Sequence, residues 1–215
     1  MTQLTLTPVK IPLEVGRLDG VLAIPEKTIG IVLFANRFGS GAQGVRDNPV
    51  ARALHESTIA TLLFDLLTPV EDSRHNNRFN VDLLAERLQL ATAWLMKQNN
   101  FSDKPIGYFG AGTGAAAALR AAAHFGKQIA AVVAQAGRLD LAGEQALTTV
   151  MAPTLLLVGG RDTSAIALNR EALASLGCKK HMHVIPGMKQ LSDAPAAVEQ
   201  VANQAATWFS RHFEN

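Results

Sequence analysis

The fold of this chain is decided by the stretch PIGYFGAGTG, residues 105–114. An apolar run of strand length leads there into Gly110, Gly112 and Gly114, and an alanine-rich helical pattern follows. This is the frame of the motif G-x-S-x-G, in which a sharp strand-to-helix turn presents a serine above a sheet. Gly112 occupies the position of that serine. The stretch therefore predicts a strand, a tight turn and a helix, without the nucleophile that the turn usually carries.

Further apolar runs of strand length recur along the chain. Continuous runs of this kind are typical of strands buried on both faces of a parallel sheet. The amino-terminal region instead reads as two strands, Thr5 to Val15 and Leu18 to Ile24, joined by a turn at Gly16. Buried strands are predicted at Gly30 to Ala35, Ala60 to Asp65, Ile106 to Gly110, Ala130 to Ala134, Thr154 to Gly159 and His181 to Ile185.

Helical patterns lie between these runs. Asn48 followed by Pro49 is typical of a cap and first turn, here of a helix through about Glu56. Apolar spacing predicts helices from Asn80 to about Gln98 and along the carboxy terminus, and Ala115 to Phe125 follows the glycine turn. Alternating strands and helices predict one α/β domain over residues 1–215, with a doubly wound, mostly parallel sheet, helices on both faces and antiparallel amino-terminal strands.

Composition limits the partners that we expect. The formal net charge is +2, and the basic residues form no clustered stripe of the kind that nucleic-acid binding requires. No window of about 18 apolar residues is long enough to span a bilayer, and no signal peptide is recognisable. The single cysteine, Cys178, fits a reducing compartment. We expect a cytoplasmic protein with a small-molecule ligand and no nucleic-acid or membrane partner; the oligomeric state stays open.

Two loops join the glycine turn at the carboxyl edge of the predicted sheet, where ligands of such folds lie. The segment Gly159-Gly160-Arg161-Asp162 places an acid directly after a buried strand. The segment Pro186-Gly187-Met188-Lys189-Gln190 follows the last strand. Along the chain, the turn comes first, the acid second and the last loop third. This is the order of nucleophile, acid and histidine in α/β hydrolases.

These segments together resemble bacterial α/β hydrolases of the dienelactone hydrolase-like family. The resemblance extends over nearly the whole chain and rests on residues 34–41, 60–68, 78–80, 110–114, 159–162 and 186–187. Family members typically read F-A-H-G-S-G-S after the third strand, G-A-S-T-G at the turn and P-G-A-T-H-L after the last strand. The chain departs from this pattern at Asn36, Arg37, Phe38, Gly112 and Gln190. Asp162 keeps the acid of the triad.

The resemblance implies a hydrolase scaffold whose Ser-His-Asp triad is dismantled. Acyl transfer needs a nucleophile and a group that accepts and returns its proton, and neither Gly112 nor Gln190 supplies one. In a serine protease, loss of the serine or the histidine costs about 10⁶ in turnover. We therefore expect no ordinary ester hydrolysis and a remodelled pocket for a carbonyl-bearing or anionic molecule. The residues predicted to form this pocket are Thr113, Asn36, Arg37, Phe38 and Met188.

Other chemistry is open at this stage. Lys189 would attack carbonyl groups as an amine if its pKa were depressed, which describes an enzyme with a replaced or engineered site. A non-catalytic scaffold that acts through protein contacts is the third reading, and a large exposed apolar patch on the carboxy-terminal helix would favour it. His181 and His183 alternate along the last strand without carboxylate or cysteine partners, so we expect no metal and no cofactor.

Overall fold

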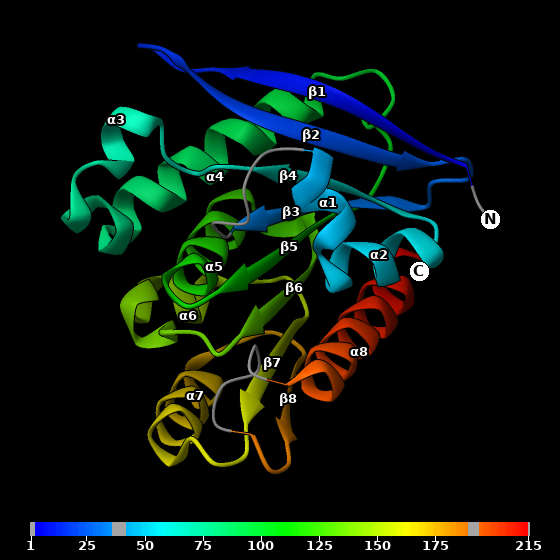
Figure 1. The fold of residues 1–215 in the computed structure, drawn as a ribbon. Coiled ribbons are helices and arrows are strands. Elements are labelled where there is room, and N and C mark those ends of the chain that lie inside the picture. The colour runs from blue at the N-terminus through cyan, green and yellow to red at the C-terminus, as the bar shows by residue number, and fades with distance from the viewer. Residues whose placement is uncertain (1–2, 36–41, 189–193, 215) are drawn as a thin grey trace.

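The computed structural model describes residues 3–35, 42–188 and 194–214. Its centre is an eight-stranded sheet with the order β1-β2-β4-β3-β5-β6-β7-β8 (Figure 1). The strands are β1 Leu4–Pro12, β2 Arg17–Pro25, β3 Gly30–Ala35, β4 Ile59–Phe64, β5 Ile106–Ala111, β6 Ile129–Gln135, β7 Thr154–Gly159 and β8 Lys180–Ile185. Strands β3 to β8 are parallel, and β2 pairs antiparallel with both β1 and β4. The predicted doubly wound α/β fold with antiparallel amino-terminal strands is confirmed.

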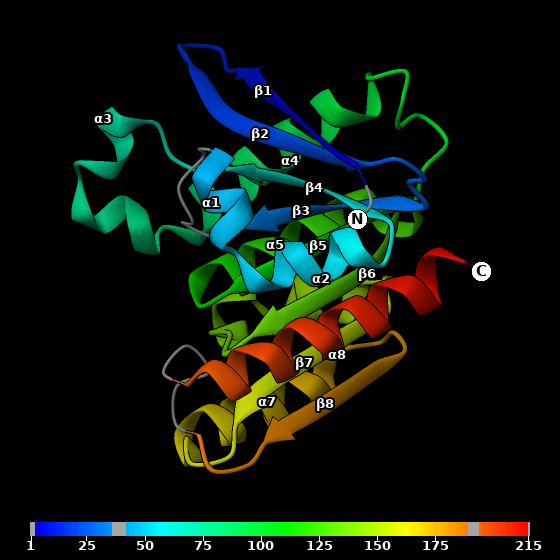
Figure 2. The same ribbon diagram turned by 45° about the vertical axis from the view of Figure 1, so that its right-hand side comes forward.

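Helices cover both faces of the sheet. One apolar cluster joins the sheet to α1, α2 and α8, and a second joins its other face to α4, α5, α6 and α7 (Figures 1 and 2). The helices are α1 Ala42–Asp47, α2 Pro49–Glu56, α3 Pro69–Asp72, α4 Val81–Met96, α5 Thr113–Phe125, α6 Glu144–Thr149, α7 Thr163–Ser175 and α8 Pro195–Phe213, with the 3-10 helices η1 His75–Phe79, η2 Gly126–Gln128 and η3 Leu139–Ala142. Since both faces are covered, every residue of β3, β4 and β7 is buried, which explains their unbroken apolar sequences.

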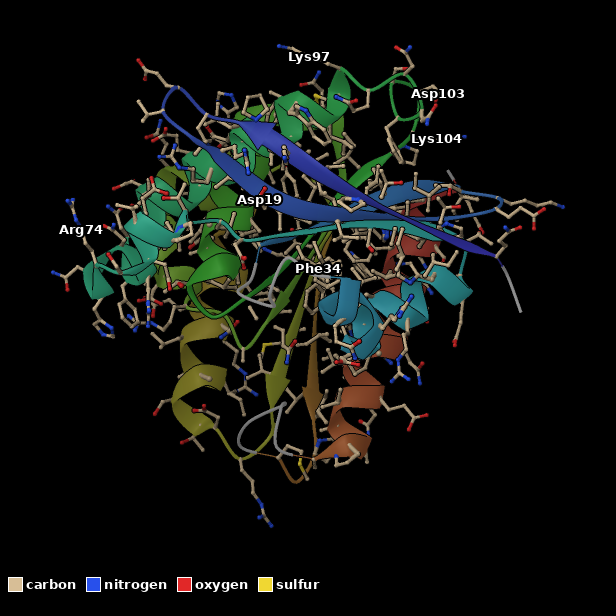
Figure 3. The ribbon with its side chains drawn as sticks, turned by 45° about the horizontal axis from the view of Figure 1, so that its top comes forward. Asp19, Phe34, Arg74, Lys97, Asp103 and Lys104 are labelled. Carbon is tan, nitrogen blue, oxygen red and sulfur yellow. The ribbon has the colours of Figure 1, made fainter. Side chains whose placement is uncertain are left out.

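Phe34 and Phe109 illustrate the packing on the face covered by α8. Phe34 of β3 lies near the middle of the molecule (Figure 3) and is 1% exposed. Its ring centre lies 5.2 Å from that of Phe109 on the neighbouring β5. This contact spacing is typical of aromatic pairs in protein cores. The central strands are therefore tied together by side chains as well as by the hydrogen bonds of the sheet.

Asparagine caps, of which Asn48 was predicted as a cap, begin two of the helices. Asn48 Oδ1 accepts a hydrogen bond from Ala51 N at the start of α2, and Asn80 Oδ1 accepts one from Leu83 N at the start of α4. A side-chain acceptor at this position satisfies one of the amide groups that a helix start leaves without an intrahelical partner. The start of each helix agrees with the position that the sequence predicts.

The apolar face of α8 packs against the sheet. Its buried residues include Val201, Ala205, Phe209 and Phe213. The predicted apolar face of the carboxy-terminal helix is thus occupied, and it provides no exposed patch of the kind that a scaffold acting through this helix would need.

None of the helices in the described ranges combines the length and the apolar composition that a bilayer crossing requires.

The His55 imidazole is buried on α2, where the residue is 8% exposed and its Nε2 lies 2.8 Å from Thr61 Oγ1 of β4. Burial lowers the pKa of His55 from 6.5 to about 4. Between these values the unfolded chain binds a proton that the folded protein does not, so stability falls as the pH is lowered.

We expect the parent chain to lose about 2 kcal/mol more than His55→Gln when the pH is lowered from 7 to 5. Urea unfolding at both pH values measures this difference. His124→Gln serves as the control because His124 is exposed, and it should keep the parent's pH dependence. Identical pH dependence in the parent and His55→Gln would contradict the assignment.

Candidate functional site

The turn from β5 to α5 keeps the sharp geometry of a nucleophile elbow. Gly112 lies between strand and helix with φ 56° and ψ −125°, a backbone conformation that residues with a side chain rarely adopt. Its N–H donates to Gln135 O at 3.3 Å, and its carbonyl accepts from Arg138 N at 3.2 Å. A Cβ placed on Gly112 would meet no described atom within 4 Å beyond its chain neighbours. The apex is thus held by backbone hydrogen bonds, and no described residue occupies the space above it.

Small residues bring α5 close to β5 at this turn. A Cβ on Gly110 would lie 2.6 Å from Gly114 O and 2.7 Å from Ala115 Cα, so only glycine fits there. Ala115, Ala116, Ala117, Ala118, Ala121 and Ala122 of α5 are fully buried. The short distance between strand and helix makes the sharp turn at Gly112 necessary.

A cavity of about 540 Å³ opens at this turn. It is lined by Ala35, Leu66, Leu67, Arg78, Phe79, Leu84, Ala111, Gly112, Thr113, Gly114, Arg138 and Leu141. The size is within the usual range of ligand sites, and most of the lining side chains are apolar. The cavity lies beyond the carboxyl ends of β3, β4 and β5, where the sequence analysis expects a site.

Two arginines line the otherwise apolar cavity, and each is paired with an aspartate. Arg78 binds Asp72 through Nε and Nη2, both at 3.0 Å, and its side chain is 34% exposed. Arg138 binds Asp140 through Nε at 2.9 Å and Nη2 at 2.8 Å. The hydrogen bond from Arg138 holds the pKa of Asp140 below its usual range, and the same bond raises the pKa of Arg138. Each pair fixes the orientation of the guanidinium of a residue that lines the cavity together with Gly112.

The position of Arg138 depends on a constrained turn after β6. Ala136 has φ 44°, and its N–H donates to Leu157 O at 2.8 Å. The buried Asn169 of α7 donates through Nδ2 to Gly137 O at 3.1 Å. These bonds from β7 and α7 hold the backbone that carries Arg138 to the cavity.

The segment from Pro69 to Phe79 forms another wall of the cavity and is built from α3 and η1. Thr68 and Glu71 form a capping box at the start of α3, and Glu71 also binds Arg87 of α4 at 2.5 Å. Burial opposes ionisation of Glu71, but the hydrogen bonds from Arg87 and Thr68 outweigh it and lower its pKa. Thr113 Oγ1 donates to Arg78 O at 3.2 Å. The Thr113 hydroxyl therefore ties this segment to the elbow.

The retained acid lies at the same edge of the sheet but is engaged as a helix cap. Asp162 Oδ1 accepts from Ala165 N at 2.9 Å at the start of α7. The Met188 carbonyl accepts a hydrogen bond from Arg161 N at 2.8 Å. The Met188 side chain packs against the apolar cluster that joins the sheet to α1, α2 and α8. The acid loop and the last loop are thus adjacent, although neither Asp162 nor Met188 is among the described residues that line the cavity.

The remaining predicted site residues, Asn36, Arg37, Phe38, Lys189 and Gln190, lie outside the described residues. Within the described ranges, no group of three or more His, Cys, Asp or Glu side chains is placed to hold a metal ion. Neither Arg78 nor Arg138 was predicted as a site residue. Two signals were available: Arg78 lies in the segment 78–80, on which the family resemblance rests, and Arg138 lies just past a predicted buried strand, at the edge where ligands bind.

Comparison with known proteins agrees with this architecture. The family model "Dienelactone hydrolase family" matches residues 18–212. The chain belongs to the dienelactone hydrolase family. The crystal structure of a dienelactone hydrolase from Anabaena variabilis is 42% identical, with a TM-score of 0.91 over 98% of this chain and 99% of that one. Est1E from Butyrivibrio proteoclasticus, 13% identical with a TM-score of 0.77 over 97% of this chain and 99% of its own, shares the fold.

A Mycobacterium tuberculosis protein named "Putative phosphoribosyl transferase" is also similar. It is 48% identical over 193 residues, which cover 90% of this chain and 43% of the relative. The chain therefore spans less than half of that relative's length. In the present chain, the dienelactone hydrolase family model covers residues 18–212, so the part that resembles this relative is the dienelactone hydrolase-like domain.

Gly112→Ser tests the strain at the elbow. We expect it to lower the free energy of unfolding by about 1–3 kcal/mol, because a side chain is forced into a positive-φ conformation. Urea unfolding of the purified variant measures the change. Ala111→Ser adds the same hydroxyl one residue earlier, on β5, and should change stability by less than about 0.5 kcal/mol. A more stable Gly112→Ser protein would contradict the strain argument.

Proposed function

We propose that this chain is a dienelactone hydrolase-like scaffold with a dismantled triad that binds a small molecule in the cavity at Gly112. The observation that carries the proposal is a glycine at the apex of an otherwise intact elbow, with no described residue in the space above it. A side-chain nucleophile is absent at this position, and Gln190 has no titratable group to replace a histidine. The cavity of about 540 Å³ remains available to a ligand.

The chemistry of the cavity favours a ligand with an apolar body and a polar or anionic group. The leucines and Phe79 favour apolar contact, and the two oriented guanidiniums supply hydrogen-bond donors. Thr113 N–H remains as a donor at the start of α5 that suits a carbonyl or anionic oxygen, because the first amides of a helix have no intrahelical partner. The cavity can therefore bind and orient a ligand, although residue 112 cannot attack it covalently.

We assign no phosphoribosyl transfer to this chain. The relatives with that name are more than twice as long as the part that matches, and the matching part here has the dienelactone hydrolase fold. We infer that the named activity belongs to the other part of those relatives. A small-molecule binding domain beside a transferase is consistent with the proposed role.

Rebuilding the triad tests the loss of hydrolysis. We expect this chain to hydrolyse p-nitrophenyl acetate at the background rate, and Gly112→Ser combined with Gln190→His to exceed it by at least about ten-fold, because nucleophile and base are restored together. The matched control combines Gly112→Ala with Gln190→His and lacks only the hydroxyl. Initial rates and labelling by a fluorophosphonate give two independent readouts. Efficient turnover and labelling of the parent chain would overturn the proposal.

A further inference from the structure

We propose that the cavity at Gly112 binds a phosphate monoester with an apolar body, whose phosphate is held by Arg78, Arg138 and the start of α5. This inference rests on the proposed function and names the ligand class of the same cavity. It begins from Arg78 and Arg138, which come from separate elements and both line the cavity together with Gly112. Neither arginine has a role in the triad positions that the fold provides.

The carboxylate partners leave part of each guanidinium available. Asp72 and Asp140 bind Nε and Nη2 of their arginines, so each aspartate holds its partner along one edge. Neither Nη1 donates a hydrogen bond to another described residue. A guanidinium carries five N–H donors in a rigid fork, so the bond to one carboxylate does not exhaust it. Each pair therefore presents an oriented donor to an incoming anion.

The start of α5 adds a third set of donors. Gly112 is the residue before the helix and has no side chain to cap it, and Thr113 and Gly114 line the cavity. Their N–H groups precede the first intrahelical hydrogen bond, and the helix dipole favours negative charge at this end. With serine at 112, a side chain would project into this space; with glycine, the space is open to a ligand oxygen.

The number of donor groups favours phosphate over carboxylate. A planar carboxylate has two oxygens, and one guanidinium fork can satisfy both. Here the donors come from η1, from the segment before η3 and from α5, which suits the three terminal oxygens of a phosphate monoester. Aspartate partners offset the arginine charges, so the site would select the ligand by its hydrogen bonds as much as by its charge.

The rest of the cavity determines the ester group. Leu66, Leu67, Phe79, Leu84 and Leu141 line it beside the two arginines. Apolar walls of this kind favour an aryl or alkyl body and disfavour inorganic phosphate, which buries no apolar surface. With glycine at the nucleophile position, the ester would be bound rather than cleaved through a phosphoryl-enzyme at residue 112.

Calorimetric titration with phenyl phosphate, benzoate, benzyl alcohol and inorganic phosphate at one ionic strength tests the proposal. We expect phenyl phosphate to bind at least about ten-fold more tightly than the other probes, because it alone combines the ring with three terminal oxygens. Arg138→Gln and Arg78→Gln should each weaken phenyl phosphate about ten-fold or more and leave benzyl alcohol unchanged. Arg74→Gln is the matched control, since Arg74 is exposed and points away from the protein (Figure 3).

The outcomes separate the two proposals. If benzyl alcohol or benzoate binds as tightly as phenyl phosphate, the phosphate assignment is wrong and the small-molecule cavity stands. If no probe binds, both are wrong. If phenyl phosphate binds tightly but the parent chain hydrolyses esters, only the dismantled triad is wrong. Should Arg78→Gln fail to fold, Arg138→Gln decides the matter, because the Arg138 side chain is 54% exposed and its pair lies at the surface.

Discussion

The close contact between α5 and β5 governs the arrangement of the whole site. Because Gly110 has no Cβ, the backbone of α5 can lie in the space that a Cβ would fill. The small, buried alanines of α5 allow the helix to stay close to the sheet along its length. The chain must then reverse sharply between Ala111 and Thr113, which places Gly112 at positive φ. A nucleophile is one use of this geometry, but the geometry itself comes from backbone packing and does not require a serine.

Backbone hydrogen bonds from the end of β6 and the residues after it also hold the elbow. Gln135 accepts the Gly112 N–H, and Arg138 donates its backbone N–H to the Gly112 carbonyl. The residue that steadies the apex through its backbone therefore also brings its guanidinium to the cavity. Asn169 extends this support to α7 through Gly137. Elbow and cavity wall form one connected unit, so a change in residue 112 leaves the surrounding arrangement in place.

The sequence predicts the sheet well, because strands covered on both faces must be continuously apolar and Asn48 and Asn80 are direct cap signals. It predicts the elbow for the same local reasons. The helices α1, α3, α6 and α7 and the three 3-10 helices were missed, although Thr68 and Glu71 carry the spacing of a capping box. The pairing of Arg78 and Arg138 around one cavity could not be predicted, since they are 60 positions apart and meet through the order of β4, β3, β5 and β6.

The aspartates explain how two arginines persist in an apolar cavity. The Arg78 side chain is 34% exposed and that of Arg138 is 54% exposed, so each guanidinium keeps part of its hydration and its aspartate supplies hydrogen bonds along one edge. Asp72 lies on α3 and Asp140 on η3, each within six residues of its arginine, so each arginine charge is balanced by a partner close in sequence. The cavity thus does not depend on a ligand for its charge balance. A bound anion adds hydrogen bonds to groups that are already oriented, and the entropy of ordering them has been lost in folding rather than in binding.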